Sequence, residues 1–214
     1  MHAFSHHYCK FPFSFSPFPI LFCFFNFLFF FFLFFFPTFV AIMNIMRQAW
    51  TWISRLGHCR GFGIQSPNDY RFVRYVINEH APYYAYKELG KNEPRTRRKL
   101  GKLYFRLANE LQPAVIVDQV GMGKWLKAGC RKAEVVEDAD TFDLAVVPIQ
   151  TEFLQLFRKC TDHSVVVFEN IWQQLPLWHC IENDPHTVIT FDLYYCGIVF
   201  FDKKRAKQNY IVNF

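Results

Sequence analysis

The chain has 214 residues, enough for one domain of ordinary size together with a short appendage. Its net charge of +6 is a mild basic excess, and no helix-turn-helix, RNA-binding signature or run of aromatics interleaved with Arg and Lys accompanies it. We therefore expect no nucleic-acid partner. The seven cysteines are scattered without a Cys-x-x-Cys pair, which argues against a disulfide framework or a zinc site.

Residues 1–42 differ in composition from the rest of the chain. They contain 17 of the 28 Phe and neither Asp nor Glu. Lys10 is the only one of the 24 Lys and Arg that precedes Met43, whereas all 18 Asp and Glu follow it. The chain thus divides into a Phe-rich hydrophobic leader and a part with the composition of a globular protein.

The leader allows two interpretations. At about 1.5 Å per residue, the uncharged segment 19–43 is long enough to cross a bilayer as a helix. Arg47 and Arg55 follow it, so the globular part would remain in the cytoplasm and the protein would be single-pass with its carboxyl terminus inside. Alternatively, the Phe-rich run is a mis-assigned start, the protein begins at Met43 or Met46, and it is cytoplasmic without a membrane anchor.

Residues 43–112 are expected to form an N-terminal helical cap. A short amphipathic helix is predicted at 44–56. Ser66 is the cap of the next helix and Pro67 lies in its first turn. A third helix follows Pro94, and its apolar stripe consists of Leu100, Leu103, Tyr104, Leu107 and Leu111.

The first half of this third helix is strongly basic. The side chains concerned are Arg95, Arg97, Arg98, Lys99, Lys102 and Arg106. We interpret the cluster as a solvated helix face, and the alternative is a contact with phosphate or with acidic lipid.

Residues 113–214 alternate between strand-like and helix-like patterns. Helices are expected at 124–133, 150–160 and 172–184, the last interrupted by Pro176. The alternation predicts an α/β domain with a mostly parallel, Rossmann-like sheet and helices on both faces. Gly197 and the turn at 203–207 predict strands that return antiparallel at one edge. The expected strands are 114–118, 134–138, 142–148, 164–170, 187–193, 197–202 and 209–214.

Acidic and glycine residues follow the first two strands. Asp118 closes the first strand, and Gly121 and Gly123 come directly after it. Glu137 closes the second strand. Ligands of parallel α/β sheets bind beyond the carboxyl ends of the strands, where glycines let the backbone approach them closely. A carboxylate at the second strand could accept hydrogen bonds from the ribose hydroxyls of a nucleoside.

The order of these elements resembles the class I S-adenosylmethionine (SAM) methyltransferases, and within them a bacterial group of small O-methyltransferase-like proteins. The resemblance implies SAM as the cofactor, with Asp118, Gly121 and Gly123 binding it and Glu137 holding its ribose. It provides no catalytic residue, and we expect no metal site. The matching segments are GFGIQSPNDYRFV (61–73), RRKLGKLYFRLAN (97–109), AVIVDQVGMG (114–123), FDLAVV (142–147), SVVVFENIW (164–172), TVITFDLYYCGIVFF (187–201) and NYIVNF (209–214).

The chain departs from the family pattern at several places, among them Gln65, where a His is often found, and Glu169 with Asn170, where two acids are common. The first turn reads Asp-Gln-Val-Gly-Met-Gly, and Pro148 and Ile149 stand where an Asp-Gly pair is common. Only residues 139–141 separate the second strand from FDLAVV, whereas the family inserts a helix, a strand and a further helix there. The sheet is therefore expected to be shortened.

Two functions remain open. The chain is either an enzyme that transfers a methyl group from SAM to a small acceptor, or a catalytically inactive methyltransferase remnant that is tethered to a membrane or binds a partner. In the second case a complex with another chain or a homo-oligomer is expected, because another chain or a second copy would cover the apolar surface that the shortened sheet leaves exposed.

Overall fold

The computed structural model describes residues 42–43, 45–47, 49–149 and 152–214, and Trp52–Phe214 form one compact unit. Within the described ranges, no helix combines the length and the apolar character needed to cross a bilayer. The segment predicted as a membrane span, 19–43, lies almost wholly outside these ranges.

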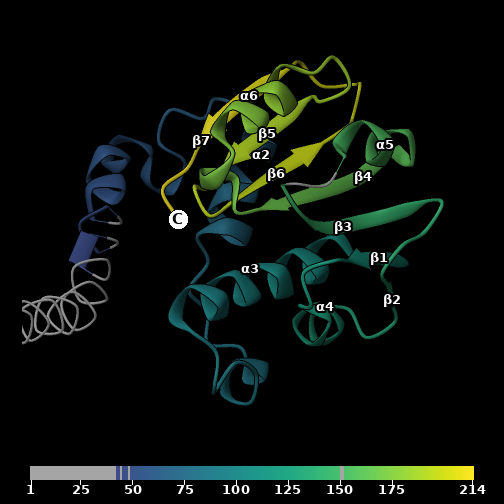
Figure 1. The fold of residues 1–214 in the computed structure, drawn as a ribbon, viewed down its shortest axis with the longest axis horizontal. Coiled ribbons are helices and arrows are strands. Elements are labelled where there is room, and N and C mark those ends of the chain that lie inside the picture. Colours follow the sequence, from purple (N-terminus) through teal and green to yellow (C-terminus); the bar gives the residue numbers. More distant parts are fainter. Residues whose placement is uncertain (1–41, 44, 48, 150–151) are drawn as a thin grey trace, which may run out of the picture. The chain divides into compact units, whose positions relative to one another are not determined.

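A seven-stranded sheet forms the centre of the unit (Figure 1). The strand order is β2-β1-β3-β4-β6-β5-β7, and β6 alone runs antiparallel to its neighbours among the described strands. The expected α/β class, with a mostly parallel sheet and an antiparallel carboxyl-terminal hairpin, is confirmed. The strands are β1 Val115–Asp118, β2 Glu134–Val136, β3 Phe142–Pro148, β4 Cys160–Glu169, β5 Ile189–Asp192, β6 Cys196–Phe200 and β7 Gln208–Ile211.

The last strand does not return beside its predecessor. The turn at 203–207 was expected to bring the chain back antiparallel, but β7 pairs in parallel with β5. The reason is that β4 and β5 already occupy the two edges of β6. The remaining edge of β5 is therefore the position that β7 takes, and β5 with β6 forms the antiparallel hairpin.

Local sequence signals set the ends of several helices. Ser66 caps α2 as predicted, because its Oγ accepts a hydrogen bond from the amide of Asp69 at 3.4 Å, and Pro67 is the first helical residue. Pro176 lies in the first turn of α6 and does not interrupt it, since that position needs no amide donor. The helices are α2 Pro67–Phe72, α3 Arg95–Leu111, α4 Gly123–Gly129, α5 Phe153–Arg158 and α6 Leu175–Asn183. A π-helical turn at Val73–Ile77 continues α2, and 3-10 turns lie at Leu56–Gly61, Tyr84–Lys87 and Ile171–Gln173.

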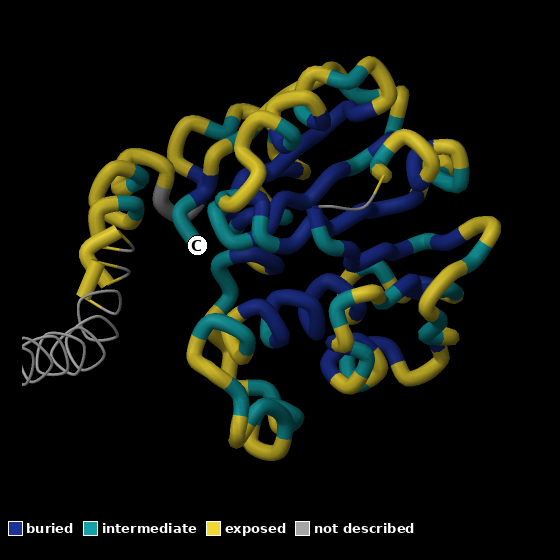
Figure 2. Tube along the Cα trace, viewed as in Figure 1, coloured by how far each residue is buried: buried dark blue, intermediate teal, exposed yellow. Residues whose placement is uncertain are grey.

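The sheet separates two hydrophobic layers, and Figure 2 shows its central strands buried between them. Leu144 and Val146 of β3 belong to the layer that contains α3 and α4. Ala145 and Val147 belong to the opposite layer, with residues of α5 and α6. This alternation follows from the two-residue period of a strand, and it confirms that helices cover both faces of the sheet.

The second layer depends on a close approach between α6 and β6. Trp178 of α6 is fully buried and its ring lies directly against Gly197 of β6. A Cβ atom at position 197 would overlap this ring. Glycine is therefore required here for space, and the indole fills the volume that a side chain would take.

Gly197→Ala is predicted to destabilise the protein by about 1–3 kcal/mol, because the added methyl group overpacks a filled core. The free energy of unfolding, measured by urea titration, tests this. Gly57→Ala is the control, since a Cβ at Gly57 meets nothing within 4 Å. Its stability should stay within about 0.5 kcal/mol of the wild type. An equal loss in both variants would contradict the packing account.

Candidate functional site

The predicted site residues lie together at the carboxyl edge of β1 and β2. Val117 of β1 pairs with Val136 of β2, so Asp118 and Glu137 follow at the same level on neighbouring strands. The side-chain amide of Gln119 donates to the main-chain carbonyl of Glu137 at 3.4 Å and joins the two strand ends. The side chain of Glu137 is exposed to solvent, whereas Asp118 is half-buried.

A tight turn, Gln119–Met122, connects β1 to α4. Asp118 stabilises it, because its Oδ1 accepts the amide of Val120 at 3.1 Å. Gly121 is exposed and has a φ of +72°, a conformation that favours glycine. A Cβ at Gly121 would meet only the Nη2 of Arg97, at 3.6 Å. The surface over Gly121 is therefore open to an approaching ligand.

Arg97 of α3 completes this turn. Its Nη2 donates to the carbonyl of Gly121 at 2.9 Å and to the carbonyl of Val120 at 3.2 Å. Within the described residues, Arg97 makes these two hydrogen bonds, and both come from Nη2. The N–H groups on Nε and Nη1 are therefore available to another acceptor. Sequence reasoning placed Arg97 in the general basic cluster and missed this role. Helical spacing was the sequence signal that could have distinguished Arg97, because it places Arg97 on the same face of α3 as the buried Gly101 and Tyr104.

A buried hydrogen bond lies next to the turn, at the end of β4. The hydroxyl of Tyr104 donates to Oε1 of Glu169 at 2.6 Å, and the two residues are 0% and 8% exposed. Burial raises the pKa of Glu169, although the Tyr104 hydrogen bond and the charge of Arg97 act in the opposite direction. The negative charge of Asp118 adds to the rise. Perturbed carboxyl groups of this kind are frequent at functional sites, and they are also found in structural networks.

A cavity of about 860 Å³ lies beside α4 and reaches one of the predicted residues, Gly123. Asp118, Gly121 and Glu137 do not line it. Its other walls come from the turn Tyr84–Lys87 and from β2, and its cations are Lys124, Lys127 and Arg131. The predicted set of four residues therefore shares an edge of the sheet, but it does not share this cavity.

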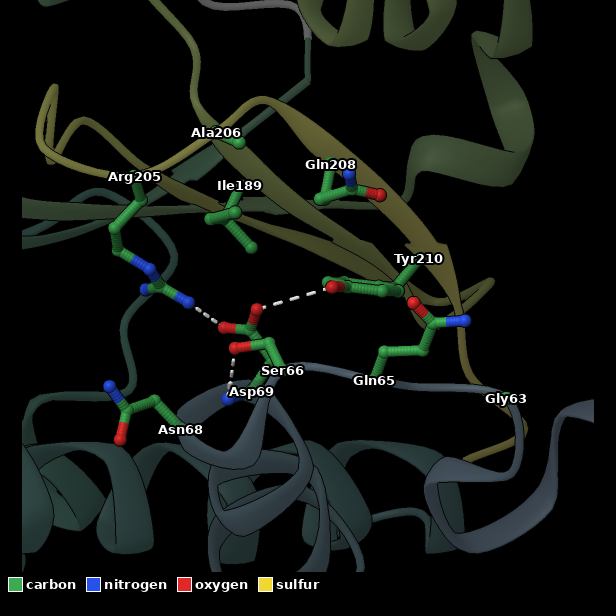
Figure 3. A pocket seen from close by; sticks show the side chains of 10 residues that line it. All are labelled: Gly63, Gln65, Ser66, Asn68, Asp69, Ile189, Arg205, Ala206, Gln208 and Tyr210. Carbon is green, nitrogen blue, oxygen red and sulfur yellow. Dashed lines mark hydrogen bonds and ion pairs between the residues drawn. The ribbon is translucent and has the colours of Figure 1, made fainter.

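A second polar group lies in a cavity of about 600 Å³ between α2 and β7 (Figure 3). Asp69 is 3% exposed and forms an ion pair with Arg205. The hydroxyl of Tyr210 donates to Oδ2 of Asp69 at 3.2 Å. Sequence reasoning missed this group, because the partners are far apart in the chain. The buried charge of Asp69 is compensated within the protein, so the group clamps α2 to β7.

Comparison with protein-family models, with curated proteins and with solved structures found no match to this chain. In the residues that the structure describes, no group of three or more His, Cys, Asp or Glu side chains is arranged to hold a metal ion. The candidate sites described so far are the carboxyl edge of β1 and β2, the cavity beside α4 and the cavity between α2 and β7.

Glu169→Gln is predicted to flatten the pH dependence of stability. Because burial raises the pKa of Glu169, the folded state binds its proton more tightly than the unfolded state does. Stability is then lost as the pH rises from about 4.3 toward the folded-state pKa. Gln does not ionise, and its carbonyl still accepts the Tyr104 hydroxyl. Urea titrations between about pH 4 and pH 8 should show the wild type losing stability relative to the variant.

Glu134→Gln is the matched control, because Glu134 is an exposed carboxylate of β2. Its stability should follow the wild type at every pH. A difference between wild type and Glu169→Gln that is constant with pH, or that favours the wild type as the pH rises, would contradict a raised pKa at Glu169.

Proposed function

We propose that this chain is a methyltransferase-like protein that binds SAM, or its demethylated product S-adenosylhomocysteine, at the carboxyl edge of β1 and β2. One observation carries the proposal. Asp118 and Glu137 lie at the same level on adjacent parallel strands, and the turn at Gly121 beside them is open to solvent. Such an edge is where nucleosides and dinucleotides bind in open α/β sheets.

Each group at this edge has a distinct part in binding. The exposed carboxylate of Glu137 accepts hydrogen bonds from the two ribose hydroxyls. The open surface at Gly121 lets the ligand lie against the main chain, and Asp118 holds the turn in that shape. Arg97 supplies its remaining N–H groups to the carboxylate of the methionine part, a pairing that a guanidinium makes well.

For methyl transfer, the site has to align the SAM methyl group with an oxygen or nitrogen of a small acceptor. Such catalysis is mainly positioning, and well-oriented groups gain most of their rate from it. Glu169 is buried and bonded to Tyr104, so we assign it to holding α3 and not to proton transfer. No catalytic residue and no metal ion enters the proposal.

A catalytically inactive, partner-binding form is the second candidate, and the shortness of β2 favours it. β2 has 3 residues and forms an edge of the sheet, and residues 137–141 lead directly into β3. Within the described residues, no element covers the outer side of Glu137. A partner or a second copy pairing with the β2 edge would supply that cover, since an open strand edge is a ready docking surface.

Thermal unfolding with and without SAM or S-adenosylhomocysteine tests ligand binding. At a hundredfold excess over the dissociation constant, the ligand should stabilise the wild type by about 2.7 kcal/mol. Gly121→Leu should abolish this gain by filling the open surface. Gly63→Leu is the control, because Gly63 is also exposed with a positive φ, +86°, and a Cβ there meets nothing within 4 Å.

Glu137→Gln should weaken binding about tenfold, through loss of a charged hydrogen-bond acceptor. Glu134→Gln should leave it unchanged, since Glu134 lies at the other end of β2. A cooperative unfolding transition that neither ligand shifts would contradict the proposal. If the protein unfolds cooperatively without a ligand-induced shift and also sediments as a dimer, the partner-binding candidate replaces the SAM-binding proposal.

A further inference from the structure

We propose that a cavity beside α3 binds a small ligand that carries two or more phosphate groups. This basic cavity has a volume of about 1030 Å³. Glu79 is the one acidic side chain among its lining residues. The cations that line it are Lys87, Arg95, Arg98, Lys99, Lys102 and Arg106. None of these residues belongs to the SAM site proposed above, so the inference is independent of that function.

Helical spacing explains why the charges gather at one place. Arg95, Lys99, Lys102 and Arg106 follow one another at intervals of three or four residues and share a face of α3. Arg97 lies on another face and binds the turn at Gly121. The sequence predicted these six basic residues to form one solvated face of the helix. In the structure, Arg97 contacts the turn at Gly121 and the other five line the basic cavity.

Arg106 is the strongest indication that the basic cavity binds an anion. It is 6% exposed, and its guanidinium donates to the carbonyls of Val76 at 2.6 Å and Ile77 at 2.9 Å. Within the described residues, no carboxylate forms an ion pair with it. Carbonyl oxygens orient a guanidinium but leave its charge uncompensated, and a buried charge is costly unless it is paired. Glu79, the acidic residue of the cavity, accepts a hydrogen bond from Tyr83 at 2.8 Å.

Within the part of the chain that the structure describes, the side-chain amide of Asn78 also lacks an acceptor for its hydrogen bond. Asn78 lines the basic cavity, and its Nδ2 is buried without a hydrogen-bond partner. Buried donors are rarely left unsatisfied in native proteins, so an acceptor from a ligand is the simplest complement. Desolvation, and then the nearby charge of Arg95, lower the pKa of Lys99. A bound anion would relieve this crowding of positive charge.

The number of charges selects the ligand class. One carboxylate would leave most of the six cations without an anionic partner, whereas two or three phosphate groups offer enough negative oxygens for all of them. Arg and Lys are the usual phosphate ligands of proteins. The volume of the basic cavity is typical of small-molecule sites, and the tyrosines at positions 83 and 86 give it an apolar wall.

Isothermal titration of the full chain, held in a non-ionic detergent, tests the proposal with tripolyphosphate as the probe. The wild type should bind it with an affinity that falls as the salt concentration rises. The double variant Arg98→Ala/Lys102→Ala should bind at least about tenfold more weakly, since each side chain contributes a charged hydrogen bond. Lys203→Ala/Lys204→Ala removes the same charge from an exposed turn outside the cavity and should bind like the wild type.

Two further arms complete the experiment. Asn78→Ala should weaken binding while thermal unfolding without ligand stays unchanged, which separates ligand contact from folding. ATP and inositol trisphosphate, compared with tripolyphosphate, show whether a nucleotide or a headgroup carries the phosphates, and tighter binding of either supports the proposal. Failure of all three probes to bind, or equal affinities in the two double variants, would overturn it.

Discussion

The buried hydrogen bond between Tyr104 and Glu169 is the constraint on which the carboxyl edge of the sheet depends. It joins the middle of α3 to the last residue of β4, a strand inside the sheet. Apolar packing alone would let a helix slide or rotate, but a polar pair in a dry interior has few alternative partners. The bond therefore fixes both the rotation and the height of α3 over the sheet.

The two surfaces named in the proposals follow from that rotation. Arg97 lies on one face of α3 and donates hydrogen bonds to the carbonyls of the turn at Gly121. Arg95, Lys99, Lys102 and Arg106 lie on another face and line the basic cavity. Without a fixed helix, the same basic residues would be an ordinary solvated cluster. Both proposals thus rest on the orientation of one helix.

The sheet is strongest at its centre and weakest where the ligand is proposed to bind. β3 is long and mostly buried, and β4 is long and buried from Ser164 to Glu169, whereas β2 has 3 residues and lies at the edge. Residues 137–141 are the whole connection from β2 to β3, so no further helix or strand lies between these two strands. Because Glu137 is exposed, its contacts with a ligand gain little from desolvation, so the affinity of the edge depends on whatever covers it.

The parts of the fold that could be predicted are those that local sequence dictates. The run at 142–148 is predicted as the third strand of the strand–helix alternation, and β3 has the same bounds. Ser66 and Pro67 set a helix start through contacts within four residues. The shared edge of Asp118 and Glu137 followed from the rule that parallel strands end together.

What could not be predicted depends on contacts between distant segments. The Tyr104–Glu169 bond and the Asp69–Arg205 ion pair join residues that no local pattern relates. The position of β7 required knowing that both edges of β6 were already paired. Arg97 could be distinguished from its basic neighbours only after the buried face of α3 was known, because its role depends on which way that face points.

Amide chemical shifts of the turn at Gly121 test the central claim most directly. In a two-dimensional NMR spectrum of the isotope-labelled protein, S-adenosylhomocysteine should shift the amide signals of residues 119–123 and 137 in a saturable manner. Signals from β7, at the opposite edge of the sheet, should stay in place. Saturable shifts confined to another part of the sheet, or none at all, would contradict a nucleoside site at the carboxyl edge of β1 and β2.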